Sequence, residues 1–373
     1  MSPSWRFICC LRAWSSGSCA VWPVSQRHGR RAAALPPLNY IAAGVIVISL
    51  TLYAVLGGAD FGGGVWDALA SGPRAKEQRR AVAEAMGPVW EANHVWLIIV
   101  IVLLFVCFAP AFAALFTALN VPLSIALVGI MLRGSAFVFR AHGAKVTGEV
   151  SLWGVVFSAA SIITPVLLGS CFGAIVSGDI RVDPRTGAVN DYLAWLAPYP
   201  LLLGLLALAI CAYLAAVYLT LETKGELQED FRKRAIGAWL AAVILATIAL
   251  PLSASAAPRI WGGLTSGFGL ALVPSAVIIG AVAVIAVWQR RYAFARIAGV
   301  TQVALIIGGW ALAQSPYLLY PDITIDNSAS ASSIILAMLI ALAIGAVVLL
   351  PSMWLLYSMF KGHNPAAAPA SEE

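Results

Sequence analysis

Long runs of apolar residues, separated by short polar segments, dominate the pattern of this chain. Nine such runs cover roughly residues 38–58, 89–109, 111–132, 152–176, 193–220, 235–257, 267–288, 297–318 and 333–360. Each is close to the ~20 residues that an α-helix needs to cross the hydrocarbon core of a bilayer. A transmembrane β-barrel would instead alternate apolar and polar residues along each strand. The pattern therefore predicts an all-α integral membrane protein with nine transmembrane helices.

The composition agrees with residence in a membrane. Hydrophobic residues make up 61% of the chain and charged residues only 11%, whereas soluble globular chains carry about 25% charged residues. The net charge of +6 comes mainly from Lys and Arg between the apolar runs, so it reports membrane topology rather than a nucleic-acid partner. The six cysteines show neither a CxxC pair nor a Cys/His spacing. We therefore expect no nucleic-acid partner and no metal site.

Lys and Arg are unevenly divided between the two sides of the membrane that nine crossings define. The richer side holds segments 65–88, 133–151, 221–234 and 289–296 and the C-terminal tail. The poorer side holds Arg181, Arg185 and Arg259, once residues 1–37 are set aside. Because cytoplasmic segments carry the excess of basic residues, the membrane domain is expected to begin outside and end in the cytoplasm.

Residues 1–37 differ from the rest of the chain. They contain several arginines, no acidic residue and no apolar run long enough to span a membrane. They are either a disordered basic extension or translated sequence upstream of the true start. Their arginines contradict the charge bias of the other segments, which favours the second interpretation. We expect three parts: this extension, a membrane domain at 38–362 and a tail at 363–373.

Two carboxylates stand at the borders of the first two apolar runs. Asp60 ends the first run inside the segment LGGADFGGG, and Glu91 opens the second. His94 follows Glu91 by three residues, so the two share a helix face. A carboxylate beside an imidazole that titrates near neutral pH can take up and pass protons. Glu91, His94 and Asp60 are therefore candidates for a proton pathway that starts at the cytoplasmic side.

Each candidate also has a purely structural interpretation. Asp60 can end a turn among glycines that let helices pack closely. Glu91 can complement the dipole of a helix that begins near Pro88. Arg133 and Arg140, at the end of the third run, either extend toward the membrane surface or pair with Asp60 or Glu91.

Haem or metal ligation by His94 is disfavoured, because such a site needs several converging ligands and no second histidine lies in an apolar run. A secondary transporter, built on Gly- and Pro-interrupted helices and an acid pair, stays open as an alternative function. A scaffold subunit without proton traffic stays open as well.

Two motifs resemble those of one known family. YAVLGGADFGGG, followed by GPVWEANHVWLI, is similar to the signature of subunit II of the cytochrome bd-type quinol oxidases. Further similar segments are LRGSAFVFR at 132–140, TPVLLGSCFG at 164–173 and ALAQSPYLLYP at 311–321. The similar segments fall in order over about residues 38–360. Gly57 replaces the first Asp of the family's first motif, and His94 stands where Gln or Glu is common, which is compatible with a cyanide-insensitive-type branch.

The resemblance implies an architecture, a complex and roles for single residues. It implies two four-helix bundles plus one peripheral helix, in a heterodimer with a haem-bearing subunit I of the bacterial inner membrane. Subunit I would carry b-type haems, or b and d haems, and the quinol site, so this chain alone would hold no haem and no complete active site. The complex would oxidise quinol and reduce dioxygen to water in aerobic respiration.

The same resemblance leaves room for a small single-helix subunit and for a bound structural quinone or lipid. Glu91 matches an acid of the family's proton route, and Asp60 matches the second Asp of the first motif. Trp96 matches a tryptophan near a proposed oxygen channel.

Overall fold

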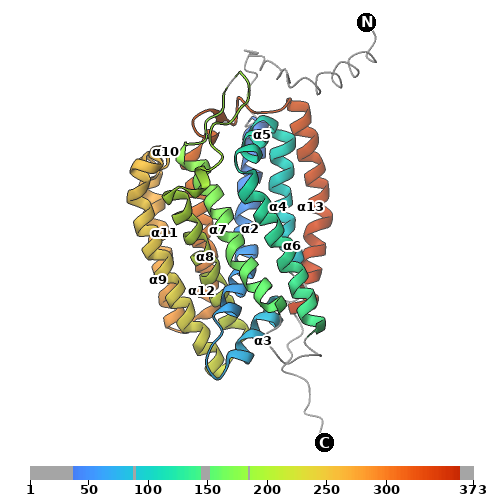
Figure 1. Ribbon diagram of the computed structural model, residues 1–373, viewed down its shortest axis with the longest axis vertical. Helices are drawn as coiled ribbons and strands as arrows, with labels where there is room; N and C mark the ends of the chain where they lie inside the picture. The colour runs from blue at the N-terminus through green and yellow to red at the C-terminus, as the bar shows by residue number, and fades with distance from the viewer. Residues whose placement is uncertain (1–36, 87–89, 144–151, 184, 362–373) are drawn as a thin grey trace, which may run out of the picture.

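The computed structural model describes residues 37–86, 90–143, 152–183 and 185–361. They form an elongated bundle of α-helices that run roughly parallel to one long axis (Figure 1). This confirms the prediction of an all-α membrane protein. Our expectations for residues 1–36 and 363–373 concern segments outside the described residues.

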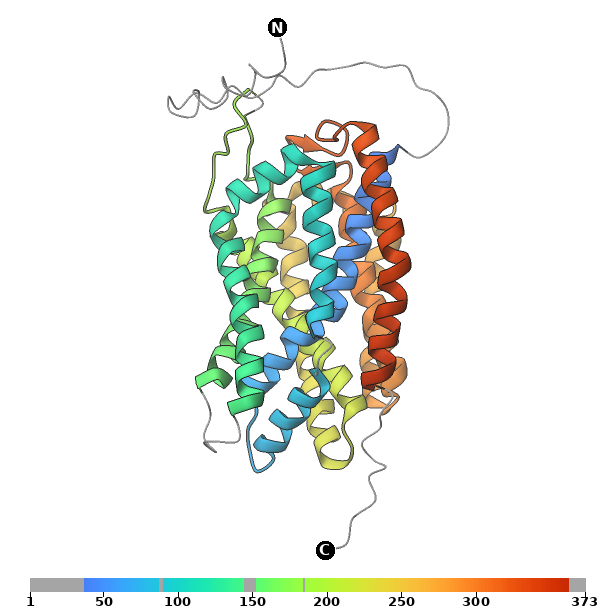
Figure 2. The ribbon, with the colours of Figure 1, turned by 90° about the vertical axis from the view of Figure 1, so that its right-hand side faces the viewer.

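Among the described residues, nine long helices make up most of the bundle. They are α2 (Leu38–Ala68), α4 (Trp90–Cys107), α6 (Asn120–Gly143), α7 (Leu152–Ser177), α8 (Pro198–Glu222), α9 (Gly225–Ala256), α11 (Gly269–Trp288), α12 (Tyr292–Gln314) and α13 (Ser332–Lys361). Shorter elements connect them: α3 (Ala75–Met86), α5 (Ala109–Ala118), the 3₁₀-helix η2 (Ala194–Leu196), α10 (Pro258–Leu264), and the antiparallel strands β1 (Tyr317–Leu319) and β2 (Ile323–Thr324). Figure 2 shows that α2 begins and α13 ends at opposite ends of the bundle.

Among the described residues, eight helices are long and apolar enough to cross a membrane, or nine if α4 and α5 count as one bent span. The third predicted run, 111–132, begins too early. Pro110 lies in the first turn of α5, and Phe108 leaves helical geometry with φ −137°. Proline has no N–H and starts a helix more readily than it continues one. As a result α5 turns away from α4 by 119° and the next crossing begins only at Asn120.

Helix α2 continues through its glycines to Ala68, so the first run does not end at residue 58. Gly62 and Gly64 are sites of close helix contact: a Cβ on Gly62 would overlap the Cys211 carbonyl of α8, and one on Gly64 would overlap Ser161 of α7. Small residues let helices approach in this way. The glycines therefore place α2 at the centre of the bundle, against α8, α4 and α7 (Figure 1), and Asp60 lies inside a helix rather than in a turn.

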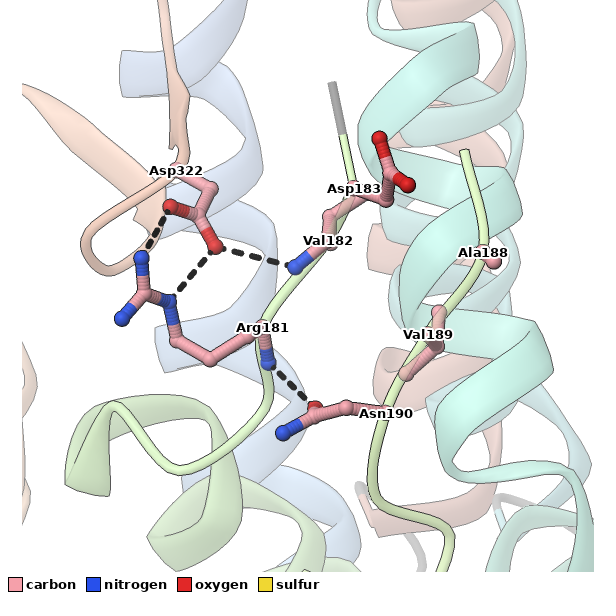
Figure 3. Close-up of a pocket in the computed structure, with 7 residues that line it drawn as sticks. All are labelled: Arg181, Val182, Asp183, Ala188, Val189, Asn190 and Asp322. Atoms are coloured by element: carbon pink, nitrogen blue, oxygen red, sulfur yellow. Dashed lines mark hydrogen bonds and ion pairs between the residues drawn. The ribbon is translucent and has the colours of Figure 1, made fainter. Parts of the chain in front are cut away.

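The two ends of the bundle are built differently. We call the end that carries α3 the α3 end, and the end with β1 and β2 the hairpin end (Figures 1 and 2). At the α3 end, Arg74 joins α3 to α9 through ion pairs with Glu226 and Asp230. At the hairpin end, Arg181 joins the segment after α7 to the β1–β2 turn through Asp322 (Figure 3).

The Arg181–Asp322 contact predicts a pH-dependent tether. Nε and Nη2 of Arg181 and the N–H of Val182 each donate to the Asp322 carboxylate at 2.9 Å. The Arg181 hydrogen bonds hold the pKa of Asp322 below its ordinary value. A carboxylate whose folded pKa is depressed contributes stability above its unfolded pKa, about 3.9, and loses it as pH falls through the folded pKa.

We therefore expect the Val182 amide to lose hydrogen-exchange protection, corrected for intrinsic exchange, when the pH is lowered below ~4. The Asp322→Ala variant, which has no side-chain acceptor for the Val182 N–H, should have low protection at every pH. Protection that stays constant on acidification in the unsubstituted protein would contradict the tether.

Candidate functional site

The candidate residues gather where α2 crosses α4. Asn93, which is buried on α4, donates its side-chain N–H to the Asp60 carboxylate and, at 3.5 Å, to the Leu56 carbonyl. His94 lies against two aromatic rings of α2, with centroid separations of 6.0 Å to Tyr53 and 6.5 Å to Phe61. Asp60 and His94 are thus brought together on facing helices, and Asn93 joins them as a residue that the sequence did not single out.

Glu91 belongs to the first turn of α4, but its side chain lies outside the described residues, as do those of the neighbouring positions 90 and 92. Trp96 is half-buried on α4 and packs with the cluster formed by Tyr53, Phe61 and Cys211. The proton role of Glu91 and the oxygen-channel role of Trp96 therefore stay predictions.

Arg133 lies in the interior of the bundle. It is only 1% exposed, so the interpretation that it extends toward the membrane surface is wrong. The reason is that α6 continues to Gly143, which leaves Arg133 well inside the helix. Its Nε donates to Ser161 Oγ at 3.2 Å, and its guanidinium lies 4.9 Å from the Phe61 ring centroid and 5.5 Å from that of Phe157. These ring contacts stabilise a cation by interaction with the π-faces.

Arg140 pairs with a carboxylate that the sequence reasoning missed. Its Nη1 lies 2.8 Å from Oδ1 of Asp67, which is 4% exposed in the last turns of α2. Ser158 Oγ of α7 donates to the other Asp67 oxygen at 3.1 Å. Arg140 thus binds Asp67, whereas the sequence offered Asp60 or Glu91 as partners. The overlooked signal was spacing: Asp60 and Asp67, like Arg133 and Arg140, are seven residues apart, which is two turns on one helix face.

Comparison with known proteins decides the family. The sequence profile described as cytochrome bd terminal oxidase subunit II matches residues 38–360. The chain belongs to this family. It is 31% identical over 205 residues to the cytochrome bd ubiquinol oxidase subunit 2 of Bacillus subtilis (strain 168), covering 54% of this chain and 58% of that protein. It is 28% identical over 214 residues to the cytochrome bd-I ubiquinol oxidase subunit 2 of Escherichia coli (strain K12), covering 57% and 54%.

The matches to these two curated relatives span somewhat more than half the length of each. The bd oxidase structure from Geobacillus thermodenitrificans superposes on this chain with a TM-score of 0.73 at 24% identity, covering 88% of this chain and 99% of that one. The fold of that bd oxidase chain is therefore shared along most of this chain. The number of nine spans and their division into two bundles plus one peripheral helix stay predictions.

Within the described part of this subunit II, no three His, Cys, Asp or Glu side chains are placed to hold a metal ion. A pocket of about 470 Å³ opens at the hairpin end (Figure 3). Its lining includes Arg181, Asp183, Asn190 and Asp322, whose polar atoms bond to each other or to nearby backbone. None of the candidate residues lines this pocket.

The burial of the Asp67–Arg140 pair predicts that its loss destabilises the protein more than the loss of an exposed ion pair. Arg140→Ala leaves a buried carboxylate without its cation, so we expect a destabilisation of about 3 kcal/mol, the lower part of the range for broken buried pairs, since Arg140 is a quarter exposed. The matched control is Arg80→Ala: Arg80 pairs with Glu84 on the exposed surface, so its loss should destabilise the protein far less. Thermal unfolding of the detergent-solubilised protein measures both. Equal shifts for the two variants would show that the Asp67–Arg140 pair has no special weight.

Proposed function

We propose that this chain is subunit II of a terminal quinol oxidase, which oxidises quinol and reduces dioxygen to water in aerobic respiration. The observation that carries the proposal is the family match, which extends over residues 38–360. Both relatives are ubiquinol oxidase subunits, which supports a quinol as the electron donor. In this proposal the chain acts as part of a complex and has no complete active site of its own.

The proposed partner is a haem-bearing subunit I. Haems of b type, or b and d, would carry electrons and bind dioxygen in that partner, where the quinol site also lies. On this chain, His94 lies against the rings of Tyr53 and Phe61. A small single-helix subunit and a bound quinone or lipid belong to the same proposal.

The proposed contribution of this chain is a proton route from the cytoplasm. The excess of Lys and Arg at the α3 end supports placing that end in the cytoplasm of a bacterial inner-membrane protein. Glu91, in the first turn of α4, stands at the entrance of the route. His94 and Asp60 follow further inside, and the Asn93 hydrogen bond to Asp60 supports this assignment by fixing the carboxylate toward α4. Trp96, beside the same aromatic cluster, is proposed to border the path of dioxygen.

Purification through an affinity tag on this chain tests the proposed complex. We expect a haem-containing partner to co-elute and to show haem bands in a reduced-minus-oxidised visible spectrum. A haem-free chain that is stable alone would contradict the proposal and favour the transporter interpretation.

A further inference from the structure

Basic side chains gather at one corner of the α3 end, where the start of α9 meets the turn between α11 and α12. Nη1 of Arg232 on α9 donates to the Trp288 carbonyl at 3.4 Å, and Nη2 of Arg290 in the turn lies 3.4 Å from Glu229 of α9. Helices α9 and α11 lie on the side of the bundle away from α13 (Figure 1). We call the following five residues the basic corner: Arg232, Lys233, Arg290, Arg291 and Arg296.

The arginines of the basic corner outnumber its carboxylates. Glu229 serves two of them, since both Arg232 and Arg290 pair with it. The sequence contains no acidic residue from 231 to 321. Within the described residues, no ion pair joins Arg291 or Arg296 to a carboxylate. The positive charge of these two side chains is therefore left for an anion outside the chain to balance.

Other arginines at the α3 end differ in this respect. Arg74, Arg80 and Arg140 each form an ion pair with a carboxylate of this chain. An excess of basic residues on one side of a membrane protein sets its topology. That rule explains why arginines lie at this end, but paired arginines would satisfy it equally well. The unbalanced charge of Arg291 and Arg296 is a local feature of the basic corner.

Large apolar side chains are exposed beside these arginines. Trp288, Phe294 and Ile297 are 70%, 53% and 63% exposed. Helix α11 ends at Trp288 and α12 begins at Tyr292, and both helices are long and apolar enough to cross a membrane. The turn between them therefore lies where the hydrocarbon core meets the headgroups, which is a usual place for tryptophan. A partner that fits this surface has an anionic group and a hydrocarbon part next to each other.

We propose that the basic corner binds an anionic phospholipid. The lipid phosphate lies against Arg291 and Arg296, and its acyl chains cover Trp288, Phe294 and Ile297. The planar guanidinium matches pairs of phosphate oxygens better than an ammonium group does. The Arg296 guanidinium also lies 6.0 Å from the centroid of a tyrosine ring on α8, Tyr218, a contact that holds it at the corner. This site is independent of the oxidase function proposed above.

Quenching of Trp288 fluorescence by brominated lipids tests the site, because bromine on an acyl chain quenches only the tryptophans that it contacts. The complex, purified through a tag on this chain, is placed in phosphatidylcholine nanodiscs. These contain a small share of brominated phosphatidylglycerol or the same share of brominated phosphatidylcholine. The difference between the unsubstituted complex and Trp288→Phe isolates the Trp288 signal. We expect brominated phosphatidylglycerol to quench this signal more strongly than brominated phosphatidylcholine does.

The arginine variants test whether charge causes this preference. Arg291→Gln and Arg296→Gln should each weaken the preference for phosphatidylglycerol about fivefold, the expected effect of one basic residue near anionic lipid. The double variant should have no preference. The matched control is Arg80→Gln, which removes an exposed arginine at the same end of the bundle. Because Arg80 pairs with Glu84, its loss should leave the preference unchanged.

Equal quenching of Trp288 by the two brominated lipids would overturn the site, and so would a preference that survives the loss of both arginines. Quenching by neither lipid would show that protein covers the corner. A preference that disappears when inorganic phosphate replaces chloride at constant ionic strength would assign the corner to a soluble phosphate and contradict the lipid. Fluorescence reports each result whether or not the complex consumes oxygen, so failure of this site and failure of the proposed function are distinguishable.

Discussion

Replacing Glu91 with Gln is expected to slow oxygen consumption by the assembled complex on the order of 100-fold at saturating quinol, while its haem content stays normal. Gln preserves the size and the hydrogen-bonding capacity of the side chain but cannot carry a proton. Oxygen reduction to water consumes protons, so a blocked entrance limits turnover without changing electron entry. An oxygen electrode measures the rate, and the visible spectrum measures haem content.

The control for this experiment is Glu84→Gln. Glu84 is an exposed carboxylate of α3, paired with Arg80 at the same end of the bundle, and its loss should leave turnover unchanged. If Glu91→Gln also leaves turnover unchanged, Glu91 has no proton role and the scaffold interpretation gains support. Asp60→Asn should have a weaker effect or reduce assembly, because Gly57 stands here in place of the first Asp of the motif, so Asp60 lacks its expected partner carboxylate.

A single methyl group at Gly62 is expected to prevent accumulation of the folded subunit. In Gly62→Ala the new Cβ would overlap the backbone carbonyl of Cys211, and a backbone atom cannot move aside as a flexible side chain can. Helix α2 would have to separate from α8, and the contacts of Asp60 and of Asp67 would separate with it. The measurement is the amount of tagged, haem-containing complex extracted from a fixed amount of membrane.

The same helix supplies the control for this change. Gly44→Ala meets no atom within 4 Å, so it should leave the yield unchanged or raise it slightly, since Ala favours a helix over Gly. Equal yields from Gly62→Ala and Gly44→Ala would show that α2 and α8 do not approach as closely as the structure places them.

The long helices could be predicted from the sequence because apolar runs of this length have one stable form in lipid. The residues at which these helices end could not be predicted in the same way. The glycines around Asp60 are compatible with a turn and with a helix surface that packs closely. Only the positions of Cys211 and Ser161 on other helices decide between these two structures. Pro110 lies at a helix break, but the residues on both sides of it are apolar, so the apolar pattern does not show the break.

Whether a charged residue is buried depends on where its helix ends. With α6 assumed to end near residue 132, Arg133 appeared to lie at the membrane surface; with α6 ending at Gly143, it lies in the interior. Asp67 falls in segment 65–88, which the apolar pattern places outside the membrane, although α2 carries it to Ser158 and Arg140. By contrast, the motifs that carry Asp60, Glu91 and Trp96 indicate the correct family from the sequence alone.

The most direct test of the account is quinol-driven oxygen consumption by the complex purified through a tag on this chain. We predict that oxygen is consumed only when reduced quinol is supplied, and that the same preparation contains a haem-bearing partner. A preparation that contains this chain alone, shows no haem absorbance and consumes no oxygen would contradict the account.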